Sequence, residues 1–369
     1  MKGKDKKQNE NKIYNLNVHK KQKNIIIQWH ITHKCNNNCK HCYEKNYPQN
    51  EILNFKDLKT IFNKIKNFEQ KYKKEITIKD IAITGGNPLL HPDCFNFIKF
   101  LIENKMRVHI LGNPENLTKE ILNNLKGIVL YQVSLDGMQI FHDSLRYKRS
   151  FETTIKALYE LRNNNIKTGI MFTLFEENKN DLLPLIDFLR DGEIPVDYFA
   201  FDFGILYKEK NKEKDKILSN KLNTEDLKNI FNAYLDRVSD PSYKFRLLLK
   251  HPYLKIMQLQ RKKINFTPNK QNICDGGCLI GYSFVIFSQG NMGLCARLPQ
   301  FIGNALTDDV EDIFLNNETI KKFRQKENFT QCKKCKYFSI CRGCPALGKS
   351  IIGDMFRSDA FCFLFEPIK

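Results

Sequence analysis

Three cysteines near the start of the chain have a type and spacing that can do chemistry: Cys35, Cys39 and Cys42. Their thiolates can converge on one cubane iron–sulfur cluster, where they would occupy three of the four irons and leave the fourth open. An open iron beside a pocket indicates chemistry at the cluster, whereas a fully ligated cluster would indicate electron transfer alone. The alternatives are a zinc site, which uses similar cysteine spacings, or unrelated thiols.

A second cysteine group lies toward the other end of the chain. The spacing C-x2-C-x5-C-x2-C forms its centre, and the whole group is Cys274, Cys278, Cys295, Cys332, Cys335, Cys341, Cys344 and Cys362. Eight thiolates fit two fully ligated 4Fe-4S clusters, and the same spacings could also support one or two structural zinc sites. Cys94 stands apart in a stretch with helical spacing, and we expect it in the core.

The elements that must position these cysteines alternate between strand and helix patterns from about 24 to 235. Apolar or β-branched runs predict strands at 25–31, 81–84, 108–111, 129–135, 168–174 and 196–203. Helical spacing predicts helices at 55–65, 93–104, 118–125, 151–163, 181–190 and 224–238. Six β–α units in a row predict an α/β fold, in which a parallel sheet forms a partial (βα)6 barrel with helices outside and one side open.

Glycine and polar residues follow the predicted strands at their C-terminal ends, where parallel barrels carry their active sites. The cysteine loop follows the first strand, and the run Gly85-Gly86-Asn87-Pro88 follows the second. Ser134 and Asp136 end the fourth strand and alternate along it, so we expect them on one face, where they would suit the hydroxyls of a ribose. Thr173 and Asp202 end strands five and six. Taken singly, such motifs are also typical of ordinary turns.

Composition divides the chain into four parts. We expect a basic N-terminal extension (1–23), the barrel core (24–239), a bridging region (240–273) and a cysteine-rich domain (274–369). The last part has short apolar segments broken by Cys, Gly and Asn. So small an apolar core needs cross-links to be stable, and bound metal is the obvious candidate.

Charge and hydropathy exclude several classes of function. Lysine and arginine number 60 against 41 acidic residues, a net charge of +19, but the excess is mostly lysine spread along the chain. Without an arginine-rich stripe or a nucleic-acid module, the composition argues against nucleic-acid binding. No apolar run approaches the ~20 residues that span a bilayer, and the basic start lacks the apolar stretch of a signal peptide. We therefore expect no membrane partner and a cytoplasmic protein, where cysteine clusters indicate metal rather than disulfides.

The order C-x3-C-x2-C with an aromatic residue after the last cysteine resembles the radical S-adenosylmethionine (radical SAM) superfamily. The resemblance implies that the amino and carboxylate groups of SAM chelate the open iron. It also implies that the loop of Gly85, Gly86, Asn87 and Pro88 binds the SAM amino group. The family has an acid where this chain has Asn87, whose amide can accept a hydrogen bond but supplies no charge.

The same resemblance assigns further cofactor contacts. Ser134 and Asp136 would bind the ribose of SAM, and Arg146 would hold its carboxylate as a bidentate fork. Thr173 and Asn180 would hold the adenine or the methionine end. For Arg146, pairing with a surface acid is the alternative. No residue of the chain is assigned a catalytic role.

The C-terminal cysteines resemble the SPASM extension, which occurs on radical SAM enzymes that modify peptides and proteins. The resemblance implies one auxiliary cluster held by Cys274, Cys278, Cys295 and Cys344, and another held by Cys332, Cys335, Cys341 and Cys362. With the first cluster, the chain would carry three 4Fe-4S clusters. The spacing departs from the family at Cys344, because two residues rather than three separate it from Cys341.

Within the superfamily, the runs Gln28-Trp29-His30-Ile31-Thr32 and Leu111-Gly112-Asn113-Pro114 resemble maturases of ribosomally made peptides. This resemblance implies a precursor peptide as substrate, a thioether or carbon cross-link as product, and an electron donor such as flavodoxin or ferredoxin. Only ~23 residues precede the first strand, too few for a domain that binds a leader peptide, so we expect the barrel, the SPASM domain or a separate leader-binding protein to recognise the leader.

Three alternatives stay open. An anaerobic sulfatase maturase resembles this chain in plan but carries an acid just after the equivalent of Cys295, where Ala296 and Arg297 stand here. A zinc or iron–sulfur binding protein without catalysis would use the same cysteines. A degenerate family member would be consistent with Asn87.

Overall fold

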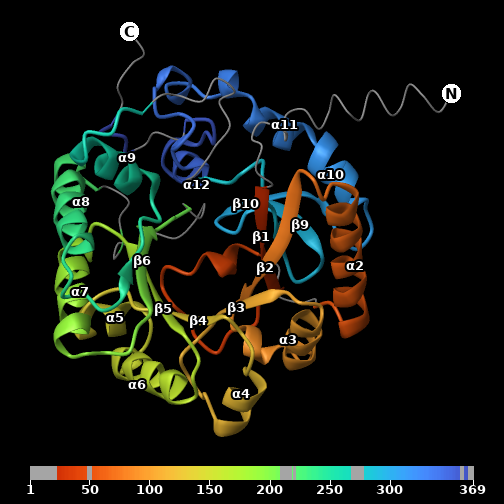
Figure 1. Cartoon of the computed structure of the whole chain (residues 1–369), viewed down its shortest axis with the longest axis horizontal. Coiled ribbons are helices and arrows are strands. Elements are labelled where there is room, and N and C mark those ends of the chain that lie inside the picture. Colours follow the sequence, from red (N-terminus) through yellow and green to blue (C-terminus); the bar gives the residue numbers. More distant parts are fainter. Residues whose placement is uncertain are drawn as a thin grey trace.

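The computed structural model describes residues 23–47, 52–207, 218, 222–266, 278–357 and 361–364. The six predicted strands pair in parallel in chain order. They are β1 (Lys23–Thr32), β2 (Ile76–Gly85), β3 (Arg107–Leu111), β4 (Leu130–Ser134), β5 (Thr168–Leu174) and β6 (Tyr198–Phe203). The predicted helices are α2 (Phe55–Lys71), α3 (Cys94–Glu103), α4 (Lys119–Asn124), α6 (Ser150–Asn163), α7 (Leu182–Asp191) and α8 (Thr224–Val238). Figure 1 shows these helices outside the strands, which confirms the predicted α/β fold.

Helix α2 illustrates how the sequence specifies these elements. Asn54 caps its N-terminus, because the side chain accepts a hydrogen bond from the backbone N–H of Asp57 at 3.0 Å. Leu58, Ile61 and Ile65 recur at three and four residues and are all buried against the sheet. None of the helices in the described part of the chain is long and apolar enough to cross a membrane.

The sheet extends beyond the six predicted strands at both ends. β7 (Arg246–Leu247) pairs with β6, and β8 (Val285–Ile286) pairs in parallel with β1. β9 (Asn291–Cys295) and β10 (Leu298–Asn304) then continue the sheet antiparallel. The described residues thus form one ten-stranded sheet in the order β10-β9-β8-β1-β2-β3-β4-β5-β6-β7. β7 lies beyond the predicted boundary at 239, and β8, β9 and β10 lie beyond the one at 273, yet all belong to the same sheet as β1 to β6. The division into four parts stays a prediction.

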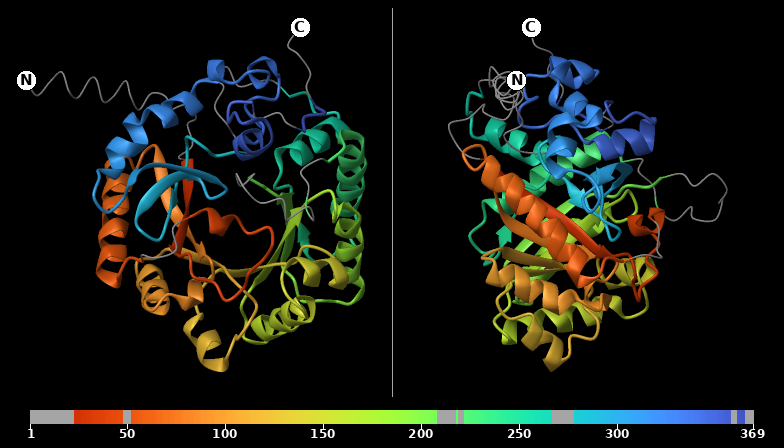
Figure 2. Two further views of the ribbon diagram at one scale, coloured as in Figure 1. Left: turned by 180° about the vertical axis from the view of Figure 1, so that it is seen from behind. Right: turned by 90° about the vertical axis from the view of Figure 1, so that its right-hand side faces the viewer.

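The C-terminal helices lie between the two ends of the arc of outer helices (Figures 1 and 2). They are α9 (Pro252–Arg261), α10 (Val310–Asn316), α11 (Glu318–Arg324) and α12 (Pro345–Leu347), and α5 (Gln139–Leu145) is a further helix beside α6. At one junction Phe314 of α10 packs on Phe68 of α2, with ring centroids 5.3 Å apart, and Tyr72 donates to Glu311 at 2.6 Å. The C-terminal part therefore closes the side of the barrel that six units leave open.

The two faces of the strands differ in burial. On β5, Phe172 and Leu174 are fully buried, whereas Met171 and Thr173 alternate with them and are half-buried. On β6, Phe201 packs on Tyr234 of α8 with ring centroids 4.9 Å apart, so the next side chain, Asp202, points to the inside of the barrel. Thr173 is the register partner of Asp202 and shares that face. The inner wall is thus partly open and polar at the C-terminal ends of the strands.

Candidate cluster and cofactor site

The loop of Cys35, Cys39 and Cys42 runs from the end of β1 to the 3-10 helix Tyr43–Asn46. The three thiols lie near enough to influence one another, and burial together with Glu44 raises the pKa of Cys42 to about 11. At neutral pH the Cys39 and Cys42 thiols would therefore hold their protons unless a bound metal stabilised the thiolates.

The loop that follows β2 packs directly on the cysteine loop. Gly86 donates its backbone N–H to Thr32 O at 2.9 Å, and Asn87 donates its own to Lys34 O at 2.8 Å. A Cβ atom on Gly86 would lie only 2.3 Å from Lys34 O, so this approach requires glycine. Pro88 is buried and begins a short 3-10 helix. The predicted SAM-binding loop and the predicted cluster loop are therefore neighbours in space.

Asparagine side chains hold the cysteine loop in place. Asn87 and Asn113 both donate to the side-chain oxygen of Asn36, at 3.2 and 3.1 Å, and Asn113 also donates to Cys35 Sγ at 3.3 Å. Asn37 donates to Glu115 at 2.6 Å. The supporting roles of Asn36, Asn37 and Glu115 were not predicted from the sequence. The run of three asparagines between Cys35 and Cys39 was the available signal.

Asp136 and Arg146, two predicted cofactor contacts, are bonded to each other. Arg146 donates from Nε and Nη2 to Asp136 Oδ2 at 2.8 and 2.7 Å, and the backbone N–H of Thr173 donates to Oδ1 at 2.8 Å. Burial would raise the pKa of Asp136, but Arg146 and His41 lower it to about 2. Arg146 Nη1 also lies 3.7 Å from Cys39 Sγ. The pair fixes the cysteine loop to the ends of β4 and β5.

The remaining predicted contacts differ in their access to the barrel interior. Ser134 is half-buried on the inner face of β4, whereas the Asp136 side chain is fully buried and already hydrogen-bonded. Asn180, which was predicted to hold SAM, is exposed, whereas Asn178, two residues earlier, is buried. The Asn178 amide donates to Asp136 O and Thr173 O, both at 2.8 Å. Ribose binding by Ser134 and Asp136, and SAM binding by Arg146 and Thr173, stay predictions.

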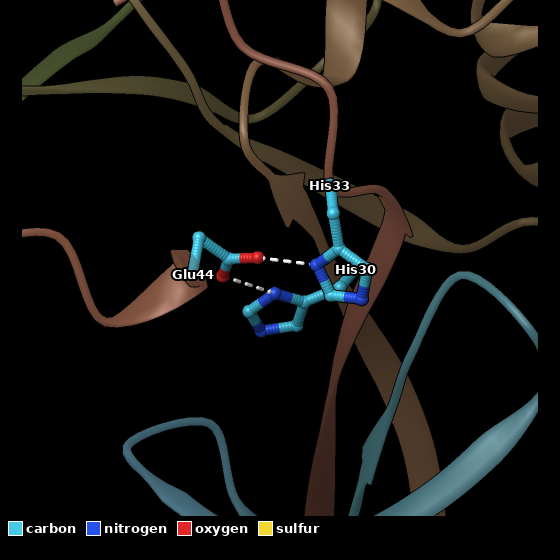
Figure 3. Close-up of side chains that lie close together, drawn as sticks. All are labelled: His30, His33 and Glu44. Atoms are coloured by element: carbon cyan, nitrogen blue, oxygen red, sulfur yellow. Dashed lines mark hydrogen bonds and ion pairs between the residues drawn. The ribbon is translucent and has the colours of Figure 1, made fainter. Parts of the chain in front are cut away.

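His30, His33 and Glu44 form a buried cluster between the end of β1 and the 3-10 helix that follows the cysteine loop (Figure 3). Glu44 Oε1 lies 2.7 Å from His30 Nδ1, and Oε2 lies 2.5 Å from His33 Nδ1. Burial would raise the pKa of Glu44, but the two histidines lower it to about 2. Glu44 comes two residues after Cys42, so these contacts tie the end of the cysteine loop to β1.

The ligand atoms of this cluster all lie within 4.8 Å of one another, as they would in a metal site. Contacts within the protein account for the cluster without an ion. The two Glu44 oxygens each face the Nδ1 atom of one histidine, and the Gln28 amide nitrogen lies 3.1 Å from His30 Nε2. We therefore interpret the three residues as a positioning cluster.

The C-terminal cysteines gather in two places. Cys332, Cys335, Cys341 and Cys362 line one cavity together with Tyr253. Cys278, Cys295 and Cys344 are neighbours elsewhere, since Cys295 and Cys344 both raise the pKa of Cys278 and Cys295 raises that of Cys344. Cys274 lies outside the described residues. The grouping follows the two predicted ligand sets, whose roles as ligands stay predictions.

The short spacing before Cys344 has a local explanation. Arg342 and Gly343 both adopt left-handed backbone conformations, with φ of 61° and 69°, and turn the chain sharply between Cys341 and Cys344. The Arg342 side chain is buried and donates to the backbone oxygens of Phe323 and Ile280, both at 3.0 Å. This turn directs Cys341 and Cys344 to different cysteine groups.

A closed zinc site would bring its sulfurs close together. A tetrahedral zinc with Zn–S bonds of about 2.3 Å keeps its sulfurs roughly 3.8 Å apart. Among the residues that the structure describes, His30, His33 and Glu44 are the only group of three whose ligand atoms lie within 4.8 Å of one another, and no cysteine trio is so close. The described cysteines are therefore not preformed at the spacing of a closed zinc site.

Two family models match the chain. Residues 29–189 match the radical SAM superfamily, and residues 274–345 match the iron–sulfur cluster-binding domain called SPASM. The first match includes the cysteine loop and the loops after β2 and β4. The second includes every C-terminal cysteine except Cys362.

Named relatives and solved structures resemble nearly the whole chain. An AdoMet-dependent heme synthase of Methanosarcina barkeri is 26% identical over 357 residues, which cover 93% of this chain and 97% of the synthase. The subtilosin biosynthesis protein AlbA of Bacillus subtilis is 26% identical over 342 residues, covering 86% of this chain and 66% of AlbA. The structure of Streptococcus suis SuiB bound to precursor peptide SuiA has a TM-score of 0.73 and 18% identity, and covers 98% of this chain and 80% of SuiB. The likeness to SuiB shows a common fold.

Proposed function

The chain carries a radical SAM domain followed by a SPASM iron–sulfur domain, and from that premise we propose that it is a peptide maturase. It would cleave SAM reductively and abstract a hydrogen atom from a ribosomally made precursor peptide. A thioether or a carbon cross-link is the expected product. A peptide substrate is supported by two similar proteins: AlbA is named for the biosynthesis of a bacteriocin, and SuiB was solved with a bound precursor peptide.

The observation that carries the proposal is the packing of two loops. The glycine-rich loop after β2 hydrogen-bonds to the backbone of the cysteine loop through Gly86 and Asn87. A cofactor held by one loop would therefore touch a cluster held by the other. Ser134 and Thr173, half-buried on the inner wall nearby, can contact the same molecule.

The mechanism assigns positioning and shielding to the protein. A 4Fe-4S cluster on Cys35, Cys39 and Cys42 supplies, when bound, the electron that splits SAM into methionine and a 5'-deoxyadenosyl radical. Asp136 and Arg146 hold the cysteine loop against β4 and β5, and Glu44 holds it against β1. The barrel wall and the C-terminal part keep cofactor and substrate close together and exclude water from a reactive radical.

We assign two auxiliary 4Fe-4S clusters to the C-terminal cysteines. Cys274, Cys278, Cys295 and Cys344 would hold the first, and Cys332, Cys335, Cys341 and Cys362 the second. These clusters would accept or relay an electron, or bind the substrate. Flavodoxin or ferredoxin as electron donor and a separate leader-binding protein belong to the same proposal.

A second candidate is a step of heme synthesis. It is favoured by the heme synthase of M. barkeri, which matches 93% of this chain and 97% of its own length. The substrate would then be a porphyrin rather than a peptide, and the cluster and SAM sites would serve the same radical chemistry.

The first experiment measures SAM cleavage. Anaerobically reconstituted protein with a strong reductant should form 5'-deoxyadenosine, detected by chromatography. A variant with Cys35, Cys39 and Cys42 all changed to Ala should form none. An iron-loaded wild-type protein that forms no deoxyadenosine would contradict radical SAM catalysis.

A second experiment separates the two candidate substrates. The active protein is incubated with a precursor peptide encoded beside its gene, or with iron coproporphyrin. The masses of the products are then measured by mass spectrometry. A mass change in the peptide that depends on SAM supports the maturase. A change confined to the porphyrin supports the heme pathway instead.

A further inference from the structure

Three charged side chains from distant parts of the chain meet on the inner wall of the barrel. Asp202 ends β6, Lys250 follows β7, and Arg297 lies in the turn between β9 and β10. Arg297 Nη2 lies 3.0 Å from Asp202 Oδ2, and its Nη1 donates to Phe203 O at 2.9 Å. Lys250 Nζ lies 3.9 Å from the same carboxylate oxygen. One carboxylate therefore faces two cations.

Arg297 and Lys250 differ in how many of their donors have a hydrogen-bond or ion-pair partner. Arg297 has a short ion pair and a backbone acceptor, and Cys295 and Cys344 are also near it. Within the described residues, Lys250 Nζ has the distant Asp202 carboxylate and the sulfur of Met171 at 3.5 Å, which is a weak acceptor. The Lys250 ammonium thus keeps most of its hydrogen-bonding capacity for another group.

Lys250 is accessible but held in place. Its side chain is 45% exposed, yet its surroundings are enclosed enough for burial to lower its pKa. The backbone on either side is fixed: Tyr234 donates to Leu248 O at 3.0 Å, and the buried His251 caps α9. A cation on a fixed backbone that lines an interior space is suited to bind a ligand rather than to solubilise a surface.

The location is where a substrate would have to lie. Asp202 is the register partner of Thr173, whose N–H binds Asp136 next to the cysteine loop. On the other side, Arg297 lies two residues after Cys295. The charged trio therefore lies between the predicted SAM cluster and the first predicted auxiliary cluster.

We propose that Lys250, beside the Asp202–Arg297 pair, binds a carboxylate of the substrate. An anion there would balance the excess positive charge of the trio and satisfy the ammonium donors. The carboxylate can come from an acidic side chain of a peptide or from a propionate of a porphyrin. The inference rests on the proposed function, since it concerns the substrate of that same site.

The test compares acids with their neutral partners. Binding to the reconstituted protein is measured by fluorescence titration with a labelled glutamate-containing peptide and its glutamine counterpart, and with coproporphyrin and its methyl ester. We expect one acid to bind at least about tenfold more tightly than its neutral partner, a difference of about 1.4 kcal/mol, because only the acid can form a charge-assisted hydrogen bond with the ammonium. A preference for the acidic peptide identifies a side-chain carboxylate, and a preference for coproporphyrin identifies a propionate.

Variants assign the preference to this site. Lys250→Gln should abolish the difference between acid and neutral partner, and Lys250→Arg should retain it. Lys244→Gln is the matched control, because Lys244 is 83% exposed and pairs with Glu193 outside the barrel. Equal binding of acid and neutral partner by the wild-type protein, or an unchanged preference in Lys250→Gln, overturns the proposal, and so does an absence of binding by both acids.

The same preparations are assayed for 5'-deoxyadenosine without substrate. The wild-type protein and the Lys244→Gln control should both form it. Loss of acid preference in Lys250→Gln, together with deoxyadenosine formation by the wild-type protein and by Lys244→Gln, supports the carboxylate site. Failure of the wild-type protein to form deoxyadenosine contradicts the proposed function and is read independently of the binding result.

Discussion

At the scale of single residues, the Asp136–Arg146 ion pair should be the most costly to break. The two side chains are 0% and 12% exposed, so Arg146→Leu would leave a buried carboxylate without its guanidinium. We expect the free energy of unfolding to fall by about 3–5 kcal/mol, measured by anaerobic denaturant titration. Arg149→Gln is the control, because the Arg149–Glu152 pair is 74% and 51% exposed and should contribute less than about 1 kcal/mol. Equal losses in the two variants would contradict this ranking.

A second residue-scale prediction concerns pH. His142 is buried, its Nδ1 accepts the Asp136 N–H at 3.0 Å, and burial together with Arg146 lowers its pKa to about 3. As the pH falls below the ordinary histidine pKa, the unfolded chain binds the proton first, so stability is lost on acidification. Between about pH 7 and about pH 5 we expect a loss of about 2 kcal/mol.

The measurement is the free energy of unfolding as a function of pH. In His142→Asn the amide oxygen can take the place of Nδ1 without titrating, so the loss between about pH 7 and about pH 5 should shrink by that amount. An identical pH profile in the variant and the wild-type protein would show that other groups cause the acid sensitivity.

Site residues could be predicted from the sequence where the chemistry allows few residue types and spacings. They could be predicted less well where contacts between distant parts of the chain determine their role. Cys35, Cys39 and Cys42 could be found because few functions use such a spacing. Asp136 was found as a polar residue at a strand end, and Arg146 through the resemblance to the radical SAM family. Their bond to each other was not, because it depends on how α5 brings Arg146 back over β4.

At the scale of elements, the approach of two loops gives a steric prediction. The Cβ of Gly86→Ala would meet Lys34 O at 2.3 Å, so the loop after β2 would have to move away from the cysteine loop. We expect SAM affinity, measured by equilibrium dialysis, to fall at least about tenfold, because losing one hydrogen bond to a charged group of SAM would cost about 1.5–3 kcal/mol.

Gly192→Ala is the matched control, since its nearest contact would be Phe188 O at 3.2 Å and it lies at the end of α7, away from the cysteine loop. It should leave SAM affinity unchanged. If Gly86→Ala binds SAM as tightly as Gly192→Ala, the loop after β2 does not set the cofactor site.

Long periodic elements were predicted well and short ones were not. β5 and α8 have the predicted bounds, because each has a clear pattern over seven or more residues. β7 and β8 have two residues each and carry no pattern of their own. They are strands because β7 pairs with the edge of β6 and β8 with the edge of β1. Such pairing between distant segments cannot be predicted from the local sequence.

At the scale of the whole molecule, Phe287 joins the two cysteine-bearing parts. It is buried between His30 and Tyr47, with ring centroids at 5.1 and 4.5 Å, and it lies in the hairpin that ends at Cys295. Phe287→Ala should cost about 3–5 kcal/mol of stability and lower the iron content at both ends of the chain. Iron and sulfide analysis, with electron paramagnetic resonance of the reduced protein, would measure it.

Phe62→Ala is the control for this prediction. Phe62 is equally buried in α2 but packs on Phe100, away from the cysteines. It should lose similar stability while keeping its iron. Full iron content in Phe287→Ala would mean that the two parts assemble their clusters independently.

The pairing of β1 with β8 also has a consequence for biosynthesis. Gln28 is the register partner of Val285, so one edge of the first strand stays unpaired until most of the polypeptide has left the ribosome. At about 5–20 residues per second the wait lasts on the order of tens of seconds. A bare apolar edge is a template for intermolecular pairing, and contacts between such distant residues form slowly. Nascent chains should therefore depend on a chaperone during translation, and rapid overexpression should yield inclusion bodies more readily than slow expression.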